Sequence, residues 1–185
     1  AVLGLPASGA MMENTWAMLA SENDRLDRET FYTTALTAIG VLAPGESPSS
    51  PRMIDQCGAM AMASIHYAYD QFRNFGHQPP HAFADIWEDY TALLADYPSD
   101  RVHQRIHMGH NCWVLPDELK FLTPAIRQRT CLIGTQDQVL ERLHELHQAG
   151  LNQVMNLPNF DTRFDVLKDI ACLLYTSDAA DESVR

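Results

Sequence analysis

The chain has few basic residues and no long apolar run. Its 185 residues include 13 Lys and Arg against 24 Asp and Glu, which gives a formal net charge of −11. This acidic balance argues against nonspecific binding to nucleic acid or to an anionic membrane, because both need a basic surface. No apolar stretch approaches the roughly 20 residues that a membrane-spanning helix needs. The sequence therefore predicts a protein without nucleic-acid or membrane partners.

Cysteines are also few and widely spaced. The four, at positions 57, 112, 131 and 172, form neither a disulfide framework nor pairs with the spacing of zinc ligands. Small buried thiols are the simpler interpretation, and disulfides are rare in the cytoplasm. We therefore expect a cytoplasmic protein.

Several nucleotide-binding and catalytic motifs are missing. The chain contains no G-x-G-x-x-G, no P-loop and no G-x-S-x-G. The sequence therefore gives no indication of a protein that binds nucleoside triphosphates or of a serine hydrolase. The hydrophobic content of 46% and the aromatic content of 9% are those of a globular protein rather than a disordered one.

Apolar segments that predict buried strands alternate with segments that predict helices. The predicted strands cover residues 1–5, 31–42 and 154–157, and the predicted helices cover residues 11–26, 52–75, 82–96 and a segment beginning at residue 135. Strands that are apolar throughout are typical of parallel sheets covered by helices on both faces. A (β/α)8 barrel and an open doubly wound sheet both have this order of elements.

Residues 134–158 give the clearest helix–strand unit. Thr135 is expected to cap a helix and Gly150 to follow its end. Apolar residues recur between them at three-to-four spacing, which predicts one buried face: Val139, Leu140, Leu143, Leu146 and Leu151. The segment 154–157 then predicts a short buried strand that ends in a loop, where parallel α/β folds place their chemistry.

The two ends of the chain suggest a fragment with an added tail. Residues 172–182, CLLYTSDAADE, resemble a translated sequencing adapter, and they interrupt the helical pattern that precedes them. We therefore expect a native part over residues 1–171 and a non-native tail over residues 172–185. The chain also begins inside an apolar run without Met, so we expect a piece of a longer protein.

Three segments stand out together: LGLPAS at residues 3–8, SENDRLDRETFYTTALT at residues 21–37 and GTQDQVLERLHELHQAGLNQVMNLP at residues 134–158. In combination they resemble the luciferase-like flavin-dependent oxidoreductases, which include bacterial luciferase, alkane-sulfonate monooxygenase and deazaflavin-linked reductases. Members of this family typically have Gly-Thr-Pro-Glu-Glu where this chain has GTQDQ. They have Ala-Gly-Leu/Val-Asp where it has AGLN.

The resemblance implies a fold, an activity and a cofactor. It implies that residues 1–171 form the C-terminal portion of a (β/α)8 barrel, incomplete and holding about its last three strands. It further implies an oxidoreductase or monooxygenase that uses FMN or coenzyme F420 on a small-molecule substrate, and a homodimer at full length. The family's catalytic residues lie mostly on earlier strands, so no catalytic residue is assigned here.

A cluster of histidines supplies the first candidate cofactor-binding residues. His107 and His110 flank Gly109, and Trp113 follows closely. We predict that His110 lines a ligand pocket with His107 nearby, because glycine permits close approach and tryptophan supplies a flat wall. Together with His103 these histidines have helical spacing, which is an alternative indication of a metal site. No glutamate stands at the spacing of a hydrolytic zinc motif, and we predict no bound metal.

Two further residues are candidate cofactor ligands. Ser8 is expected at a helix N-terminus, where it either caps the helix or binds a phosphate. Asn156 is polar within an apolar strand and needs a partner if it is buried, for which the pyrimidine side of a flavin is one possibility.

The alternative to an enzyme is a noncatalytic α/β interaction or dimerisation fragment. In that interpretation the methionine-rich helix, with Met53, Met60 and Met62, packs on a partner subunit.

Overall fold

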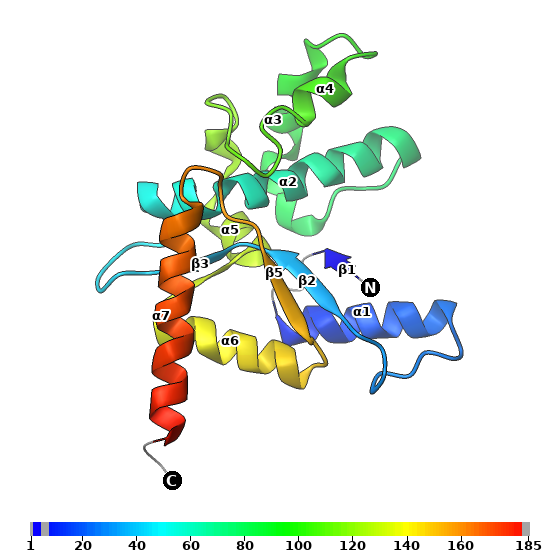
Figure 1. Ribbon diagram of the computed structural model, residues 1–185. Coiled ribbons are helices and arrows are strands. Elements are labelled where there is room, and N and C mark those ends of the chain that lie inside the picture. Colours follow the sequence, from blue (N-terminus) through cyan, green and yellow to red (C-terminus); the bar gives the residue numbers. More distant parts are fainter. Residues whose placement is uncertain (1, 5–7, 183–185) are drawn as a thin grey trace.

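The computed structural model describes residues 2–4 and 8–182 (Figure 1). It is a mixed α/β structure with short parallel strands and more helix than strand. The elements are β1 (Val2–Gly4), α1 (Gly9–Glu22), β2 (Thr34–Thr37), β3 (Ile39–Val41), α2 (Pro51–Phe75), η1 (His81–Phe83), α3 (Ala84–Ala95), α4 (Val102–Ile106), η2 (Leu119–Phe121), α5 (Pro124–Thr130), β4 (Leu132–Gly134), α6 (Gln136–Gln148), β5 (Gln153–Asn156) and α7 (Arg163–Glu182).

One stretch of chain, residues 34–41, contributes the central strand of a three-stranded sheet and one strand of a two-stranded sheet. The expected single strand over residues 31–42 is divided at Ala38 into β2 and β3. β2 pairs in parallel with β1 and with β5, and β3 pairs in parallel with β4. The predicted parallel strands are therefore confirmed.

The hydrogen bonds place β4 and β5 on opposite edges of this stretch. The carbonyls of Thr33 and Thr37 accept the N–H groups of Gln153 and Leu157, whereas the carbonyl of Ala38 accepts the N–H of Leu132. Because successive carbonyls of a strand point to opposite edges, β4 lies on the same edge as β1. In a (β/α)8 barrel each strand is followed along the sheet by the next strand of the chain. The described strands have a different order and do not close into a barrel.

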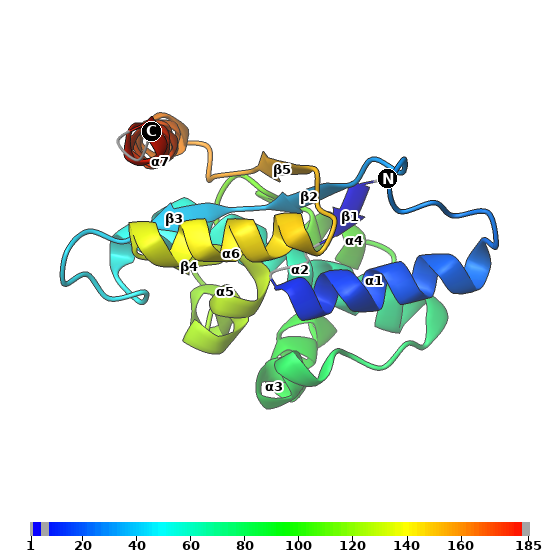
Figure 2. The same ribbon diagram turned by 90° about the horizontal axis from the view of Figure 1, so that it is seen from below.

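Alternating side chains of the central stretch enter two separate apolar cores. Ala35 and Ile39 point into a core built with α1, α6 and α7, whereas Leu36 and Ala38 contact a core built with α2, α3 and α5. Figure 2 shows α6 and α1 one after the other along the strands, with the end of α6 next to the start of α1. This alternation follows from the two-residue repeat of a β-strand. Helices therefore cover both faces, as the apolar strands predicted.

Helix α6 confirms the prediction of a helix that Thr135 caps and that buries one apolar face. The hydroxyl of Thr135 accepts the N–H of Gln138 at 3.4 Å, and the Gln138 side chain accepts the N–H of Thr135 at 2.9 Å. This reciprocal pair is a capping box. Val139 and Leu146 are fully buried, as their spacing predicted.

Other expectations about the elements are wrong. The expected buried strand near residue 154 is β5, where the side chain of Met155 is 45% exposed and no residue is fully buried. Strand β4 was not anticipated, because Leu132–Gly134 is too short for a periodic signal.

Helix α7 continues across residue 172 without a break, and Leu173 is buried. The origin of the tail stays a prediction.

The methionine-rich helix is not available to a partner through its methionines. Met53, Met60 and Met62 of α2 are all buried within the chain's own core. They pack with small residues of the same helix, which allow neighbouring elements to approach closely.

Among the described helices, none is both long enough and apolar enough to cross a membrane.

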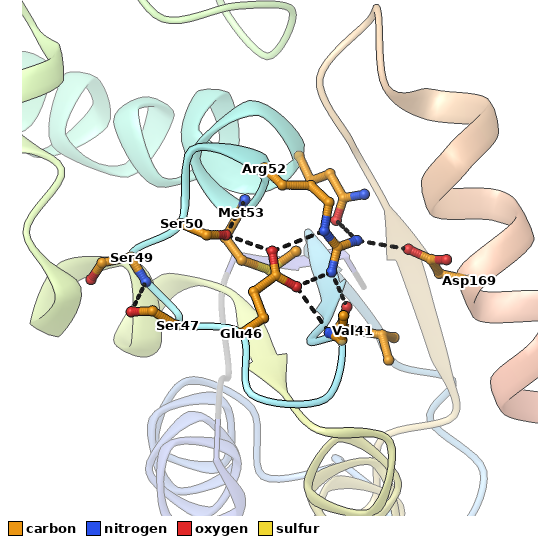
Figure 3. Close-up of polar contacts among 10 residues, drawn as sticks. Val41, Glu46, Ser47, Ser49, Ser50, Arg52, Met53 and Asp169 are labelled. Atoms are coloured by element: carbon orange, nitrogen blue, oxygen red, sulfur yellow. Dashed lines mark hydrogen bonds and ion pairs between the residues drawn. The ribbon is translucent and has the colours of Figure 1, made fainter.

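Arg52 connects four parts of the chain at the start of α2 (Figure 3). Its guanidinium donates to both carboxylate oxygens of Glu46, to the carbonyl of Val41 at 2.7 Å and to Asp169 of α7 at 3.2 Å. Glu46 also accepts the N–H of Ala43 and the hydroxyl of Ser50. The Arg52 hydrogen bonds hold the pKa of the Glu46 carboxyl down, to about 2 from 4.5.

We expect Glu46→Gln to lower the free energy of unfolding at pH 7 by about 1–2 kcal/mol, because Arg52 then keeps only Asp169 as a charged partner and the site is open enough for solvent to screen the pair. The pKa of Glu46 is lower in the folded state, so its stabilisation is complete above pH 4.5 and disappears as the pH falls toward 2. Urea denaturation of both proteins across this range measures the difference. Glu88→Gln, at an exposed position of α3, is the control, and a difference that does not shrink with acid would contradict the pairing.

Candidate ligand-binding site

A cavity of about 500 Å³ lies between the middle of α2 and the loop that follows α4. Its lining residues come from β2, from one face of α2 and from that loop: Leu36, Met60, Ala63, Ser64, Tyr67, Asp70, His107, His110 and Asn111. Ligand pockets of roughly 300–1,000 Å³ are typical of small-molecule sites. The structure thus places His107 and His110 against one cavity.

The local sequence fixes α2 as one wall of the cavity. Ser50 accepts the N–H of Met53 at 3.2 Å, and Pro51 occupies the first turn of the helix. Residues 60, 63, 64, 67 and 70 then recur at three-to-four spacing, so their side chains share one face of the helix. Small side chains at Ala63 and Ser64 leave room for the cavity between the larger ones.

The opposite wall is a tight loop with unusual backbone conformations. Gly109 has φ +71°, and Asn111, with φ +58°, is the only residue other than glycine with positive φ in the described part of the chain. Such conformations cluster at binding sites, where the surrounding structure maintains them. Trp113 packs on Gly109 and does not line the cavity. The prediction that Trp113 forms a wall of the pocket is therefore wrong, because the space above Gly109 holds the indole.

Electrostatics keep His110 neutral near pH 7. Partial burial is the main cause of a lowered pKa of His110, and the rings of His66 and His107 lower it further. The His107 ring lies 5.2 Å from that of His110, and its Nε2 is 3.6 Å from a carboxylate oxygen of Asp70. A neutral imidazole has one N–H donor and one acceptor nitrogen. His110 therefore offers the cavity either role.

A buried ionic network lies behind the cavity wall. Glu118, 1% exposed, accepts hydrogen bonds from Arg105 at 2.9 Å and from Nε2 of His66 at 3.1 Å. Arg105 also donates twice to Asp117. Burial alone would lower the pKa of Arg105, but the two carboxylates outweigh it and raise the pKa. In the neutral tautomer that donates Nε2–H to Glu118, Nδ1 of His66 is an acceptor.

Four buried polar atoms near the cavity have no hydrogen-bond partner among the described residues. They are His66 Nδ1, Tyr90 Oη, His110 Nδ1 and Asn111 Oδ1, and no other side-chain atom in the described ranges shares this state. The His66 ring stacks on those of Tyr90 and His110, with centroids 6.4 and 5.9 Å apart. Buried polar atoms almost always have partners. Of these four residues His110 and Asn111 line the cavity, and they are its candidate polar groups.

The other two candidate cofactor ligands lie elsewhere. Ser8 caps α1 and accepts the N–H of Met11 at 3.3 Å, while Glu145 accepts the N–H of Gly9. Asn156 at the end of β5 accepts the N–H of Ile39 at 2.9 Å. Both side chains therefore have partners within the chain, and neither lines the cavity with His107 and His110.

The histidines do not form a metal centre in the described structure. His103 lies exposed on α4, one turn before His107. No group of three or more His, Cys, Asp or Glu side chains in residues 2–4 and 8–182 has a geometry that could hold a metal ion.

Sequence reasoning missed most of the polar residues behind the cavity. His66 is embedded in a helix of small and apolar residues, and Arg105 and Glu118 resemble ordinary surface charges. Their burial depends on contacts between residues 13 to 52 positions apart, for which no local pattern gives a signal. The sequence feature that could best have indicated this network is the pair of adjacent acidic residues after Pro116.

Comparison of this chain with protein-family models, with curated proteins and with solved structures found no match.

We expect Gly109→Ala to disturb the loop and to change the fluorescence of Trp113. An added Cβ would stand 2.5 Å from Nε1 of Trp113, and the backbone has positive φ. Both effects together are expected to cost about 2 kcal/mol of stability. Gly76→Ala is the matched control, because Gly76 has φ +70° but open space around it. Equal effects of the two substitutions on fluorescence would contradict the packing of Trp113 on Gly109.

Proposed function

We propose that the cavity binds the ring system of a flavin or deazaflavin, and that the chain acts within a luciferase-like oxidoreductase on a small-molecule substrate. The observation that carries this proposal is the group of unpartnered polar atoms beside an apolar wall. Leu36, Met60 and Ala63 supply the apolar side, and His110 and Asn111 the polar side. A flavin ring has the same division between a benzenoid side and a pyrimidine side with N–H and carbonyl groups.

The roles of the residues follow from their chemistry. Asn111 Oδ1 is an acceptor suited to an imide N–H, and a neutral His110 donates or accepts a proton at the cavity wall. Glu118 and Arg105 fix the His66 ring on which His110 stacks. A bound flavin supplies hydride transfer or oxygen activation, and the protein orients it and excludes water.

We further propose that this chain is the C-terminal portion of a (β/α)8 barrel in a longer protein. The support is the run of parallel strands with helices on both sides and the resemblance of residues 3–8, 21–37 and 134–158. In the complete barrel β4 would lie between β3 and β5. A structure of the longer protein that kept the β2–β5 pairing would overturn this part of the proposal.

We expect His110→Ala to weaken flavin binding by about tenfold, because it removes a hydrogen-bonding group and a stacked ring from the cavity wall. Quenching of flavin fluorescence during titration of the purified chain measures the dissociation constant. His144→Ala is the matched control, since His144 lies exposed on α6, away from this cavity. Equal affinities of the wild type and both variants would contradict the proposed site.

A second candidate function, self-association, is favoured by an exposed apolar stripe on α7. Phe164 and Leu167 are 68% and 62% exposed. Their spacing of three residues places them on one side of the helix. Exposed apolar patches commonly mark interfaces between proteins. In this candidate function α7, rather than the methionines of α2, contacts a second copy of the chain.

We expect Leu167→Glu to shift the chain toward the monomer if the stripe forms an interface. Sedimentation velocity over a range of concentrations measures the change. Ala92→Glu is the control, because it adds the same single negative charge at an exposed helical position on α3, away from the stripe. A wild-type chain that stays monomeric at all concentrations would exclude this second function and leave the flavin proposal unaffected.

A further inference from the structure

Two cysteines meet in the core on the side of α2 away from the cavity. The sulfur of Cys131, just before β4, lies 3.6 Å from the carbonyl oxygen of Cys57 in α2, and both side chains are fully buried. Gly40 of β3 leaves room for them, because an added Cβ there would stand 3.0 Å from Sγ of Cys57. Neither cysteine lines the cavity, so the proposed function leaves both thiols unused.

A buried cation lies near this pair without a carboxylate of its own. Arg127 of α5 is 2% exposed, and its guanidinium donates to neutral groups, namely the carbonyls of Leu122 and Pro48 and the hydroxyl of Ser49. Burial lowers the pKa of Arg127, and among the described residues the groups that raise it are sulfurs, that of Cys131 first. A buried charge is costly unless an opposite charge is close. Ionisation of Cys131 supplies that charge.

The two thiols differ in how readily they ionise. Hydrogen bonding from the Cys57 thiol is the main cause of a lowered pKa of Cys131, and the Thr130 hydroxyl, the N–H of Ala38 and the charge of Arg127 lower it further. The same hydrogen bond, together with burial, raises the pKa of Cys57. The thiolate is the form of cysteine that reacts with oxidants. Cys131 is therefore the better nucleophile, and Cys57 stays protonated beside it.

We propose that Cys57 and Cys131 form an oxidisable pair whose substrate is a small hydroperoxide. The sulfur of Cys131 attacks one peroxide oxygen, the O–O bond breaks, and the other oxygen takes up the thiol proton and leaves as water. The Cys57 thiol then attacks the sulfenic acid on Cys131, the S–O bond breaks, and a second water leaves. The two thiols lose two electrons and hydrogen peroxide gains them, so the products are one disulfide and two waters.

Burial decides which oxidants the pair accepts. A bulky disulfide such as oxidised glutathione cannot reach covered sulfurs in the folded chain, whereas hydrogen peroxide needs only a local opening. The seven-residue helix α5 leads directly into Cys131, and its opening exposes that sulfur. The new disulfide links α2 to the start of β4. The link lies about one turn before Met60, the first residue of α2 that lines the cavity.

Peptide mapping by mass spectrometry, after treatment of the reduced and folded chain with hydrogen peroxide, tests the pair. We expect a peptide that links Cys57 to Cys131, although Cys172 is the exposed cysteine and Cys112 is partly exposed. In Cys57→Ser, Cys131 is expected to stop at the sulfenic acid, which dimedone traps. In Cys131→Ser, Cys57 is expected to remain a thiol.

Variants of Arg127 test the electrostatic part separately. Arg127→Gln is expected to slow disulfide formation about tenfold, because the Cys131 thiolate loses its neighbouring cation. Arg127→Lys keeps the charge and is expected to react at a rate close to that of the wild type. Arg129→Gln is the matched control, since Arg129 lies exposed two residues later on the same helix.

Different results overturn different parts of the proposal. Thiols at Cys57 and Cys131 that survive while Cys112 and Cys172 are oxidised overturn the pair. A linked peptide that forms only in urea above the unfolding midpoint overturns reaction through local opening. Equal rates in the wild type and Arg127→Gln overturn the role of Arg127. A sulfenic acid on Cys57 in Cys131→Ser overturns the order of attack. The flavin site is tested independently of all these results.

Discussion

The central stretch of chain, residues 34–41, is the constraint on which the rest of the structure depends. All parallel pairings among the described residues involve it, with β1 and β4 on one edge and β5 on the other. Its alternating side chains also divide the apolar residues between two cores. A shift of one residue in this stretch would exchange its faces, since the side-chain repeat of a strand is two. The positions of α2 and α6 relative to each other follow from this single register.

The cavity is a consequence of how α2 covers one face of that stretch. Large side chains such as Met53 and Ile65 fill the core, while Ala63 and Ser64 leave space beside Leu36. The polar groups behind this space are costly to bury, because a desolvated ion pair gains little unless its remaining hydrogen bonds are made. Glu118 and Arg105 satisfy each other, but Nδ1 of His66 and Nδ1 of His110 are buried without hydrogen-bond partners in the described chain. A polar ligand would complete the network.

Local sequence patterns predicted the elements that depend on local interactions. The capping box at Thr135 and the apolar spacing of α6 involve residues within one or two turns, and the structure confirms both. Strand β4 and the exposure of β5 depend on which strands lie next to each other in space. A segment of three or four residues is too short for its sequence pattern to predict these neighbours. For the site, a cluster of three nearby histidines predicted that His107 and His110 lie together. The contacts of Arg105 with Glu118 and of Trp113 with Gly109 could be identified only from the three-dimensional structure.

Polar residues at strand ends hold the framework of the site rather than its ligand. Asn156 fixes the backbone at Ile39, and Asn159 in the following loop is buried against α2. There Asn159 accepts the N–H of Ala59 at 3.0 Å and donates its own N–H to the carbonyl of Gln56. These Asn159 hydrogen bonds reach Ala59, one residue before Met60, which is the first residue of α2 that lines the cavity. Arg52 fixes the start of the same helix through its hydrogen bonds to Glu46. A site held within fractions of an ångström needs such support, because binding geometry depends on elements that do not shift. The loop after β5 therefore contributes to the site by positioning α2.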